Sequence, residues 1–153
     1  MRAVVQRVLS GKVSVAGGDK LELLGAIGPG LVVLLGVAVD DTPQDARYLA
    51  EKIVSLRIFN DFNGKLNRST LELKLPILSV SQFTLFGDCR HGRRPSFTEA
   101  APPELGERLY DLFCETVQSL GVEVIKGRFR SNMIVEINND GPVTLLLDSK
   151  KRF

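Results

Sequence analysis

The sequence of 153 residues is poor in the side chains that most often carry catalysis or bind metals. It has 1 histidine, 2 cysteines and no tryptophan. His91 lies among arginines with no acidic residue beside it, which argues against a Ser-His-Asp or Cys-His site. Cys89, His91 and a distant Cys114 lack the paired CxxC spacing of zinc sites, so we expect no metal. Two cysteines also form no disulfide framework, which favours the reducing cytoplasm.

The sequence also lacks a long hydrophobic run and a strong excess of one charge. Its longest nearly apolar stretch, Leu31–Val39, is too short to span a bilayer, and the N-terminus has no apolar secretion signal, so we expect no membrane partner. Lys plus Arg number 20 and Asp plus Glu number 18, a net charge of +2, which argues against a protein that coats a nucleic-acid duplex. A local basic patch remains possible.

No phosphate-binding loop is evident. Gly28-Pro29-Gly30 imitates one, but its proline removes an N–H that such a loop needs. An enzyme built on this chain would therefore work without cofactor, metal or histidine base. The hydrophobic fraction of 44% and the charged fraction of 25% are those of a globular protein, and the length suits one domain, residues 1–153.

Apolar patterning predicts a series of strands separated by Gly, Pro and Asn turns. We expect a hairpin turn at Ser10-Gly11 and another turn at Asn139–Pro142, and a central buried strand over Leu31–Val39. The expected strands are Ala3–Leu9, Lys12–Val15, Leu21–Ile27, Leu31–Val39, Pro76–Leu85, Val122–Lys126, Met133–Asn138 and Val143–Leu147.

Two helices interrupt the strands. Thr42 is a good N-cap, with Pro43 at the first helical position and Asp45 able to complete a capping box. The second helix should begin near Pro102-Pro103 and end at Gly121. We therefore predict an α+β fold, in which antiparallel and mixed sheets form a barrel-like layer and both helices pack on one face.

Two segments are unusual for their expected elements. Ser79–Leu85 places two serines, a glutamine and a threonine in a strand, either as an edge strand with a wet face or as a strand end that presents hydroxyl and N–H groups to a ligand. Asn138–Thr144 contains a Gly-Pro bond, which usually marks only a turn, although X-Pro bonds also adopt the cis form.

Together these segments resemble the signature pair of the D-aminoacyl-tRNA deacylases, the D-tyrosyl-tRNA deacylase family. The resemblance extends in order over nearly the whole chain, through Met1–Val8, Gly30–Val37, Leu56–Phe59 with Gly64–Asn67, Ser81–Leu85, Arg93–Phe97 and Asn139–Thr144. It implies a hydrolase that cleaves the ester between a D-amino acid, or glycine, and the 3′ end of tRNA. It also implies a homodimer with the active site at the interface.

In the family, a cis Gly-Pro dipeptide of one subunit enters the partner's site, where its carbonyls exclude L side chains. The resemblance assigns this role to Gly141 and Pro142, with Arg7 holding the dipeptide in place. Rejection by a stiff backbone separates enantiomers without recognising the side chain. The neighbouring motif residues assigned to the same substrate-binding and chiral-selection site are Asn139, Val143 and Thr144.

The other motif implies the catalytic wall, formed by Ser81, Gln82, Phe83 and Thr84. The resemblance makes the N–H groups around Phe83 and Thr84 an oxyanion hole. A threonine nucleophile needs a base, and none is visible nearby, so we favour activation of water by the 2′-hydroxyl of the terminal ribose.

Phe129 and Met133 match positions that line the adenosine pocket in the family, whereas the simpler interpretation is core packing. Arg130 and Ser131 stand where relatives usually carry alanine or glycine.

The basic stretches Arg90–Arg94 and Lys150–Arg152 are either solvated surface or contacts for acceptor-stem phosphates. Two other functions compete with D-aminoacyl-tRNA deacylation. One is the related editing of L-alanyl-tRNA, and the other is a non-catalytic module that binds RNA ends.

Overall fold

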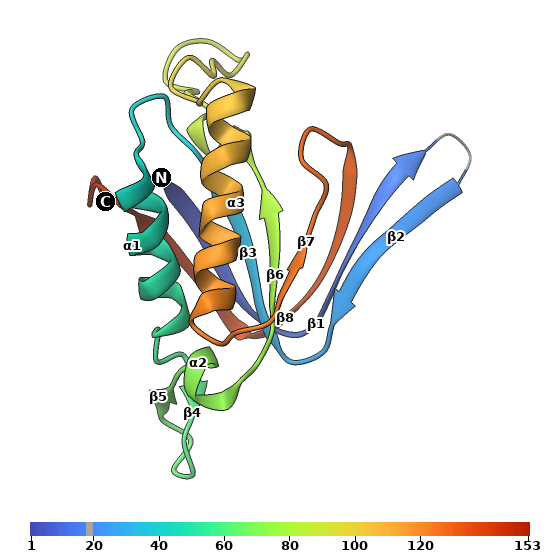
Figure 1. Cartoon of the computed structure of the whole chain (residues 1–153), viewed down its shortest axis with the longest axis vertical. Coiled ribbons are helices and arrows are strands. Elements are labelled where there is room, and N and C mark those ends of the chain that lie inside the picture. The colour runs from blue at the N-terminus through green and yellow to red at the C-terminus, as the bar shows by residue number, and fades with distance from the viewer. Residues whose placement is uncertain (18–19) are drawn as a thin grey trace.

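The fold is α+β, as the sequence predicts, and a computed structural model describes it for residues 1–17 and 20–153. Figure 1 shows a strongly curved, barrel-like sheet with two long helices lying side by side on one face. The helices are α1 (Pro43–Val54), α2 (Thr70–Leu73) and α3 (Pro103–Ser119), with a 3₁₀ turn η1 (Phe83–Phe86). The strands are β1 (Arg2–Gly17), β2 (Lys20–Ile27), β3 (Gly30–Gly36), β4 (Phe59–Asn60), β5 (Leu66–Arg68), β6 (Ile77–Ser81), β7 (Val124–Lys126) and β8 (Met133–Asp148).

The large sheet is organised around the long strand β1. Its first half pairs antiparallel with β3 and its second half with β2, while β8 runs antiparallel along its other edge. β6 and β7 add to β3 in parallel, giving the order β2-β1-β3-β6-β7. β4 and β5 form a separate small hairpin around a turn at Asp61–Gly64.

The main core lies between this sheet and the two long helices. Both helices begin close to their predicted residues, and α3 ends just before the predicted Gly121, which has φ +90°. β3 is buried along nearly its whole length, which confirms the predicted central strand, although it ends at Gly36. The apolar stripe of α3, including Leu109, Phe113 and Val117, faces the same core.

The turn predicted at Ser10-Gly11 is wrong, because β1 continues straight through it. A Cβ atom at Gly11 would lie 2.8 Å from Val32 Cγ2. This glycine therefore permits close packing of β1 against the neighbouring strand, and it marks no reversal of the chain.

The turn predicted at Asn139–Pro142 is also wrong as a boundary between two strands. β8 runs from Met133 to Asp148 without interruption, and its register against β1 shifts beside Val8. Asn139 pairs with Val8 and Thr144 with Gln6, so the intervening residues bulge out of the ladder. The Gly141–Pro142 peptide bond in this bulge is cis, and Gly141 has φ +114°.

The strand predicted over Pro76–Leu85 is shorter than expected. β6 ends at Ser81, and η1 follows from Phe83 to Phe86. β6 pairs with β3 on one side and β7 on the other, so the interpretation as an edge strand is wrong. The polar residues Ser81, Gln82 and Thr84 instead lie where β6 ends and the 3₁₀ turn η1 begins.

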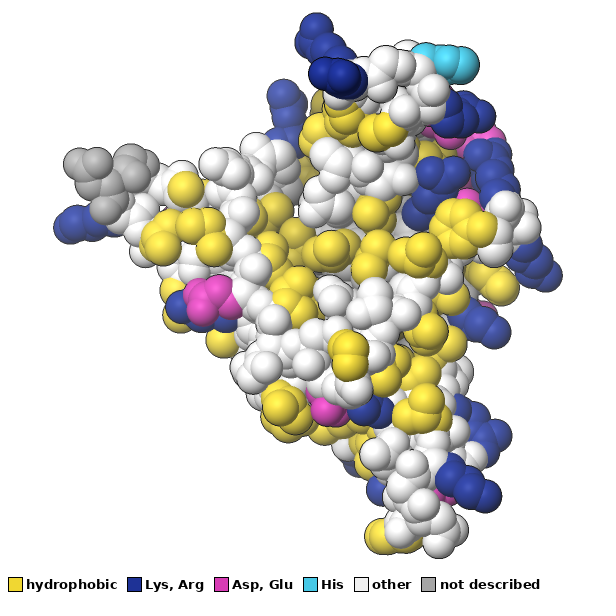
Figure 2. Space-filling view, turned by 180° about the vertical axis from the view of Figure 1, so that it is seen from behind, with side chains coloured by type: hydrophobic (Ala, Val, Ile, Leu, Met, Phe, Trp, Pro, Cys, Tyr) yellow, Lys and Arg dark blue, Asp and Glu magenta, His cyan; other side chains and the backbone are white. Residues whose placement is uncertain are grey.

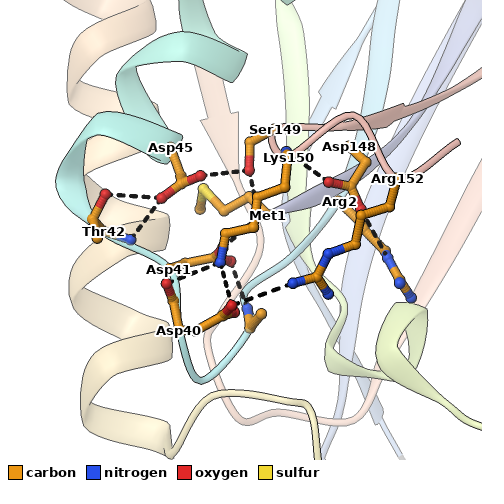
Figure 3. Close-up of polar contacts among 11 residues, drawn as sticks. Met1, Arg2, Asp40, Asp41, Thr42, Asp45, Asp148, Ser149, Lys150 and Arg152 are labelled. Carbon is orange, nitrogen blue, oxygen red and sulfur yellow. Dashed lines mark hydrogen bonds and ion pairs between the residues drawn. The ribbon is translucent and has the colours of Figure 1, made fainter.

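The two chain termini meet beside the start of α1 (Figure 3). The N-terminal ammonium contacts Asp41 Oδ1 at 2.6 Å and Ser149 Oγ at 2.7 Å, and the Ser149 hydroxyl donates to Asp45 Oδ1 at 2.7 Å. Asp45 also accepts from the Thr42 N–H and hydroxyl, both at 2.8 Å, which forms the predicted N-terminal cap. Within the described residues, no helix is long and apolar enough to cross a membrane.

Candidate active site

A cavity of about 660 Å³ opens where β6 ends, between η1, the start of α3 and the segment before β8. Such a volume suits a nucleoside-sized ligand. The predicted catalytic residues Ser81, Gln82 and Phe83 line one wall, and Phe129 and Met133 line another. The structure therefore brings together residues of two regions that the sequence singled out separately.

Contacts with the core fix the position of the end of β6. Tyr110 of α3 donates its hydroxyl to the Ser79 carbonyl at 2.9 Å, and the Gly127 N–H donates to the same oxygen at 2.9 Å. Burial raises the pKa of Tyr110 far above its usual range, so the hydroxyl remains a donor. These contacts hold rigidly the strand from which the catalytic wall projects.

The amide groups that follow β6 are the most informative feature of this wall. The Gln82 N–H donates to the Leu35 carbonyl at 2.8 Å and the Leu85 N–H to the Gln82 carbonyl at 3.3 Å. Between them, the N–H groups of Phe83 and Thr84 have no acceptor among the described residues, as expected for the first amides of a helical turn. Phe83, which carries one of these two adjacent donors, lines the cavity, and Thr84 is the next residue along the chain.

The side chains of this turn support its shape. The Gln82 side-chain amide hydrogen-bonds the Thr84 hydroxyl, which lies outside the lining of the cavity. The Phe83 ring packs edge-on against Phe97, with 5.0 Å between centroids. Phe97 lies in a motif that carries the family resemblance, yet the sequence alone assigned it no role. It contributes a second aromatic wall.

The opposite wall is aromatic and apolar. Phe129 lies against α3, where a Cβ at Gly106 would sit 3.3 Å from its ring, and its centroid is 6.4 Å from that of Tyr110. Arg130 and Ser131 also line the cavity. Arg130 adopts φ +55°, a left-handed conformation that favours glycine.

The Gly141-Pro142 bulge forms a second, separate cluster. Arg7 is buried and bonds the Ile58 carbonyl at 2.7 Å, while its Nε lies 2.8 Å from the Asp140 carboxylate. Asn139 donates to the carbonyls of Arg7 at 2.8 Å and Val143 at 3.1 Å. Arg7 therefore holds the bulge through Asp140, a motif residue to which the sequence gave no role.

Thr144 completes this cluster. Its hydroxyl lies 3.4 Å from Asn139 Oδ1 and accepts from the Gln6 side chain at 3.2 Å. These contacts therefore stabilise the bulge in which Gly141 and Pro142 are exposed.

The structure does not bring the bulge and the cavity together in one chain. Neither Gly141 nor Pro142 lines the cavity, and Gly141 lies eight positions after Met133 in β8, roughly 25 Å at the rise of a strand. Within the described residues, the predicted site therefore exists as two halves, one at the start of β8 and the other at its middle.

His91 and Cys89 are exposed in the loop after η1, whereas Cys114 is buried in α3 as a small apolar side chain. None of these three residues lines the cavity. Among the described residues, no group of three or more His, Cys, Asp or Glu side chains is arranged to hold a metal ion.

The sequence as a whole matches one protein family. A sequence model of the family described as D-Tyr-tRNA(Tyr) deacylase matches residues 4–148. The chain belongs to this deacylase family. Curated relatives named D-aminoacyl-tRNA deacylase include those of Desulforudis audaxviator, 60% identical, and Fervidobacterium nodosum, 58% identical. Both alignments cover 100% of each chain.

Two solved structures share this fold. A protein named c-Myc DNA Unwinding Element Binding Protein has a TM-score of 0.87 and 39% identity, covering 97% of this chain and 98% of that one. A probable eukaryotic D-amino acid tRNA deacylase has a TM-score of 0.80 at 23% identity, covering 95% and 97%, and shows the shared fold.

Proposed function

We propose that this protein is a D-aminoacyl-tRNA deacylase, a hydrolase that releases the D-amino acid and free tRNA, and that it acts in the cytoplasm. The observation that carries the proposal is that the N–H groups of Phe83 and Thr84, which have no acceptor among the described residues, follow the strand end that lines a nucleoside-sized cavity. Membership of the deacylase family gives those groups a substrate whose ester carbonyl they can polarise.

Hydrolysis needs little from the side chains in this arrangement. Water adds to the ester carbonyl, and the two amides stabilise the negative charge that develops on its oxygen. The tetrahedral intermediate then collapses, the ester C–O bond breaks, and the ribose oxygen leaves with a proton. The 2′-hydroxyl of the terminal ribose orients the water, which accounts for a wall without a histidine or carboxylate base. Ser81 and Gln82 position this turn.

The cavity receives the terminal adenosine in this proposal. Phe129 and Met133 offer an aromatic and a thioether surface for the base. Their apolar surroundings are equally compatible with core packing, but both residues border the cavity.

Chiral selection completes the proposal and requires a second subunit. Gly141 and Pro142 are exposed, braced by Arg7, Asn139, Val143 and Thr144, and distant from the cavity of their own chain. In a homodimer they would enter the partner's cavity and present backbone carbonyls where an L side chain would go. Glycine and D-amino acids would be accepted because neither places a side chain there.

A related editing of L-alanyl-tRNA is less well supported, because Arg7 and both signature motifs fit the D-specific pattern. A non-catalytic nucleic-acid-binding role is the second candidate, favoured by the neighbour named for binding a DNA element.

Turnover separates catalysis from binding. Release of D-tyrosine from D-tyrosyl-tRNA should exceed the enzyme concentration many times over at low enzyme. Binding of D-tyrosyl-tRNA without release of D-tyrosine would establish a binding module instead.

A further inference from the structure

A second groove lies at the other end of η1 from the cavity. It has a volume of about 600 Å³, and we call it the cationic groove. The residues that line it include Arg2, Phe86, Asp88, Arg90, Glu99 and Arg152. Its cations come from the first strand, the loop after η1 and the C-terminal tail. Figure 2 shows Lys and Arg side chains gathered along one edge of the face it displays. The fold thus unites basic segments that are distant in the sequence.

The guanidinium groups in the cationic groove are held in place and still have donors to offer. Arg90 pairs with Asp88 at 2.7 Å, Arg2 with Asp148 at 3.3 Å, and Arg152 with Asp40 at 3.3 Å. Each guanidinium carries five N–H donors, and its contacts with the described residues use only one or two of them. The remaining donors can bind phosphate oxygens without breaking these pairs.

An aromatic stack accompanies the cations. The Arg2 guanidinium lies 4.5 Å from the centroid of Phe86 and 5.7 Å from that of Phe153. Phe153 is 63% exposed, so one face of its ring remains open to a base. Cations that follow a backbone, interleaved with an exposed aromatic ring, are the combination that binds single-stranded nucleic acid.

The position of the cationic groove relates it to the cavity. Phe83 and Phe86 stand at the two ends of η1, about 6 Å apart at the rise of a 3₁₀ turn. Phe83 lines the cavity and Phe86 lines the groove. That separation corresponds to one or two nucleotides at about 3.4 Å each. A single-stranded nucleic acid whose last nucleotide fills the cavity would therefore reach the cationic groove within one or two nucleotides.

We propose that the cationic groove binds the phosphates of the unpaired nucleotides immediately before the terminal adenosine, with a base stacked on Phe153. This inference rests on the proposed function, because it requires the terminal nucleotide to occupy the cavity. The groove supplies affinity for the polynucleotide, while the cavity and η1 act on the ester.

The test compares two substrates, the D-tyrosyl ester of adenosine and that of a single-stranded tetranucleotide ending in adenosine. Wild-type protein should show a kcat/KM about tenfold or more higher for the tetranucleotide. The double variant Arg90→Gln, Arg152→Gln should lose this preference, with the loss confined to the longer substrate. Its log–log salt dependence should weaken by about 0.7 for each phosphate contact removed.

Lys52→Gln controls for the loss of an exposed cation outside the groove, since Lys52 is exposed about 15 Å along α1 from its start. It should keep the wild-type preference. A double variant that retains both the preference and the salt dependence overturns the groove proposal alone, as does a wild type that hydrolyses both esters equally. A wild type that hydrolyses D-tyrosyl-tRNA but neither ester also overturns the groove proposal alone, whereas one that fails on D-tyrosyl-tRNA as well overturns the proposed function itself.

Discussion

The main mechanistic question at the level of single residues is whether Thr84 contributes its hydroxyl or its backbone N–H. The hydroxyl is bonded to the Gln82 side chain and has no base beside it, whereas the N–H has no acceptor among the described residues. The structure therefore favours the amide as the contributing group.

The pair of variants Thr84→Ala and Thr84→Pro separates these contributions. Both remove the hydroxyl, but only proline removes the N–H, at a position early in a helical turn where proline is tolerated. Thr84→Ala should keep kcat within about tenfold, and Thr84→Pro should lose about 10²–10³-fold. Single-turnover hydrolysis of D-tyrosyl-tRNA measures both, with circular dichroism as the check on folding. Equal, near-complete losses would instead identify a hydroxyl nucleophile.

Among the secondary-structure elements, the start of α1 depends on the ionised Asp45. Although partial burial would raise its pKa, hydrogen bonds from Ser149 and Thr42 lower the pKa of Asp45 to about 2. A carboxyl whose pKa is depressed by folding stabilises the folded state above the unfolded pKa, near 4, and loses that contribution as the pH falls towards 2.

Asp45→Asn should consequently lower the free energy of unfolding at pH 7 by about 1 kcal/mol, allowing for solvent screening at this half-buried site. The gap between wild type and variant should close between about pH 4 and pH 2. Denaturant titrations at a series of pH values measure it. Glu51→Gln, on the exposed face of the same helix, should leave stability nearly unchanged. A gap that does not vary with pH would contradict the assignment.

Helices were predictable from sequence because their signals are local. The Thr42 cap, Pro43 and the 3.6-residue apolar period act within one element, and α1 begins as expected. The sequence divided the long strands β1 and β8 wrongly, because glycine and proline in β-structure can mark either a turn between two strands or a close contact or bulge within one strand. Gly11 permits close packing against Val32, and Gly141-Pro142 forms a bulge, and both effects depend on neighbouring strands that local pattern does not identify.

The candidate site, like the fold, could be predicted only in part. The residues of its two motifs were identifiable because they depart from strand patterning, and the resemblance gave them roles. The N–H groups left unpaired after β6 were not visible in the sequence, since they depend on the strand ending at Ser81. The brace between Arg7 and Asp140 likewise needs the pairing of β1 with β8.

For the whole molecule, the division of the site predicts that function depends on how subunits pair. Gly141→Ala should displace the bulge, because its Cβ would lie 2.9 Å from Val143 Cγ2 at φ +114°. Homodimers of this variant should hydrolyse L-tyrosyl-tRNA as well as D-tyrosyl-tRNA. Gly64→Ala, at φ +74° with open space around it, controls for backbone strain alone and should keep the selectivity.

Mixing Gly141→Ala chains with an equal amount of Thr84→Pro chains then tests the interface. About half of the intact cavities would face an intact bulge, so hydrolysis of the L-ester per Gly141→Ala chain should fall by about half while that of the D-ester is kept. The measurement follows subunit exchange, checked by the mass of the mixed species. No change on mixing would place bulge and cavity in the same chain.

The most direct measurement is the ratio of kcat/KM for D-tyrosyl-tRNA to that for L-tyrosyl-tRNA, taken with the wild-type protein at low enzyme. The account predicts a ratio above about 100, because a braced backbone excludes every L side chain sterically. Equal hydrolysis of both esters would contradict it.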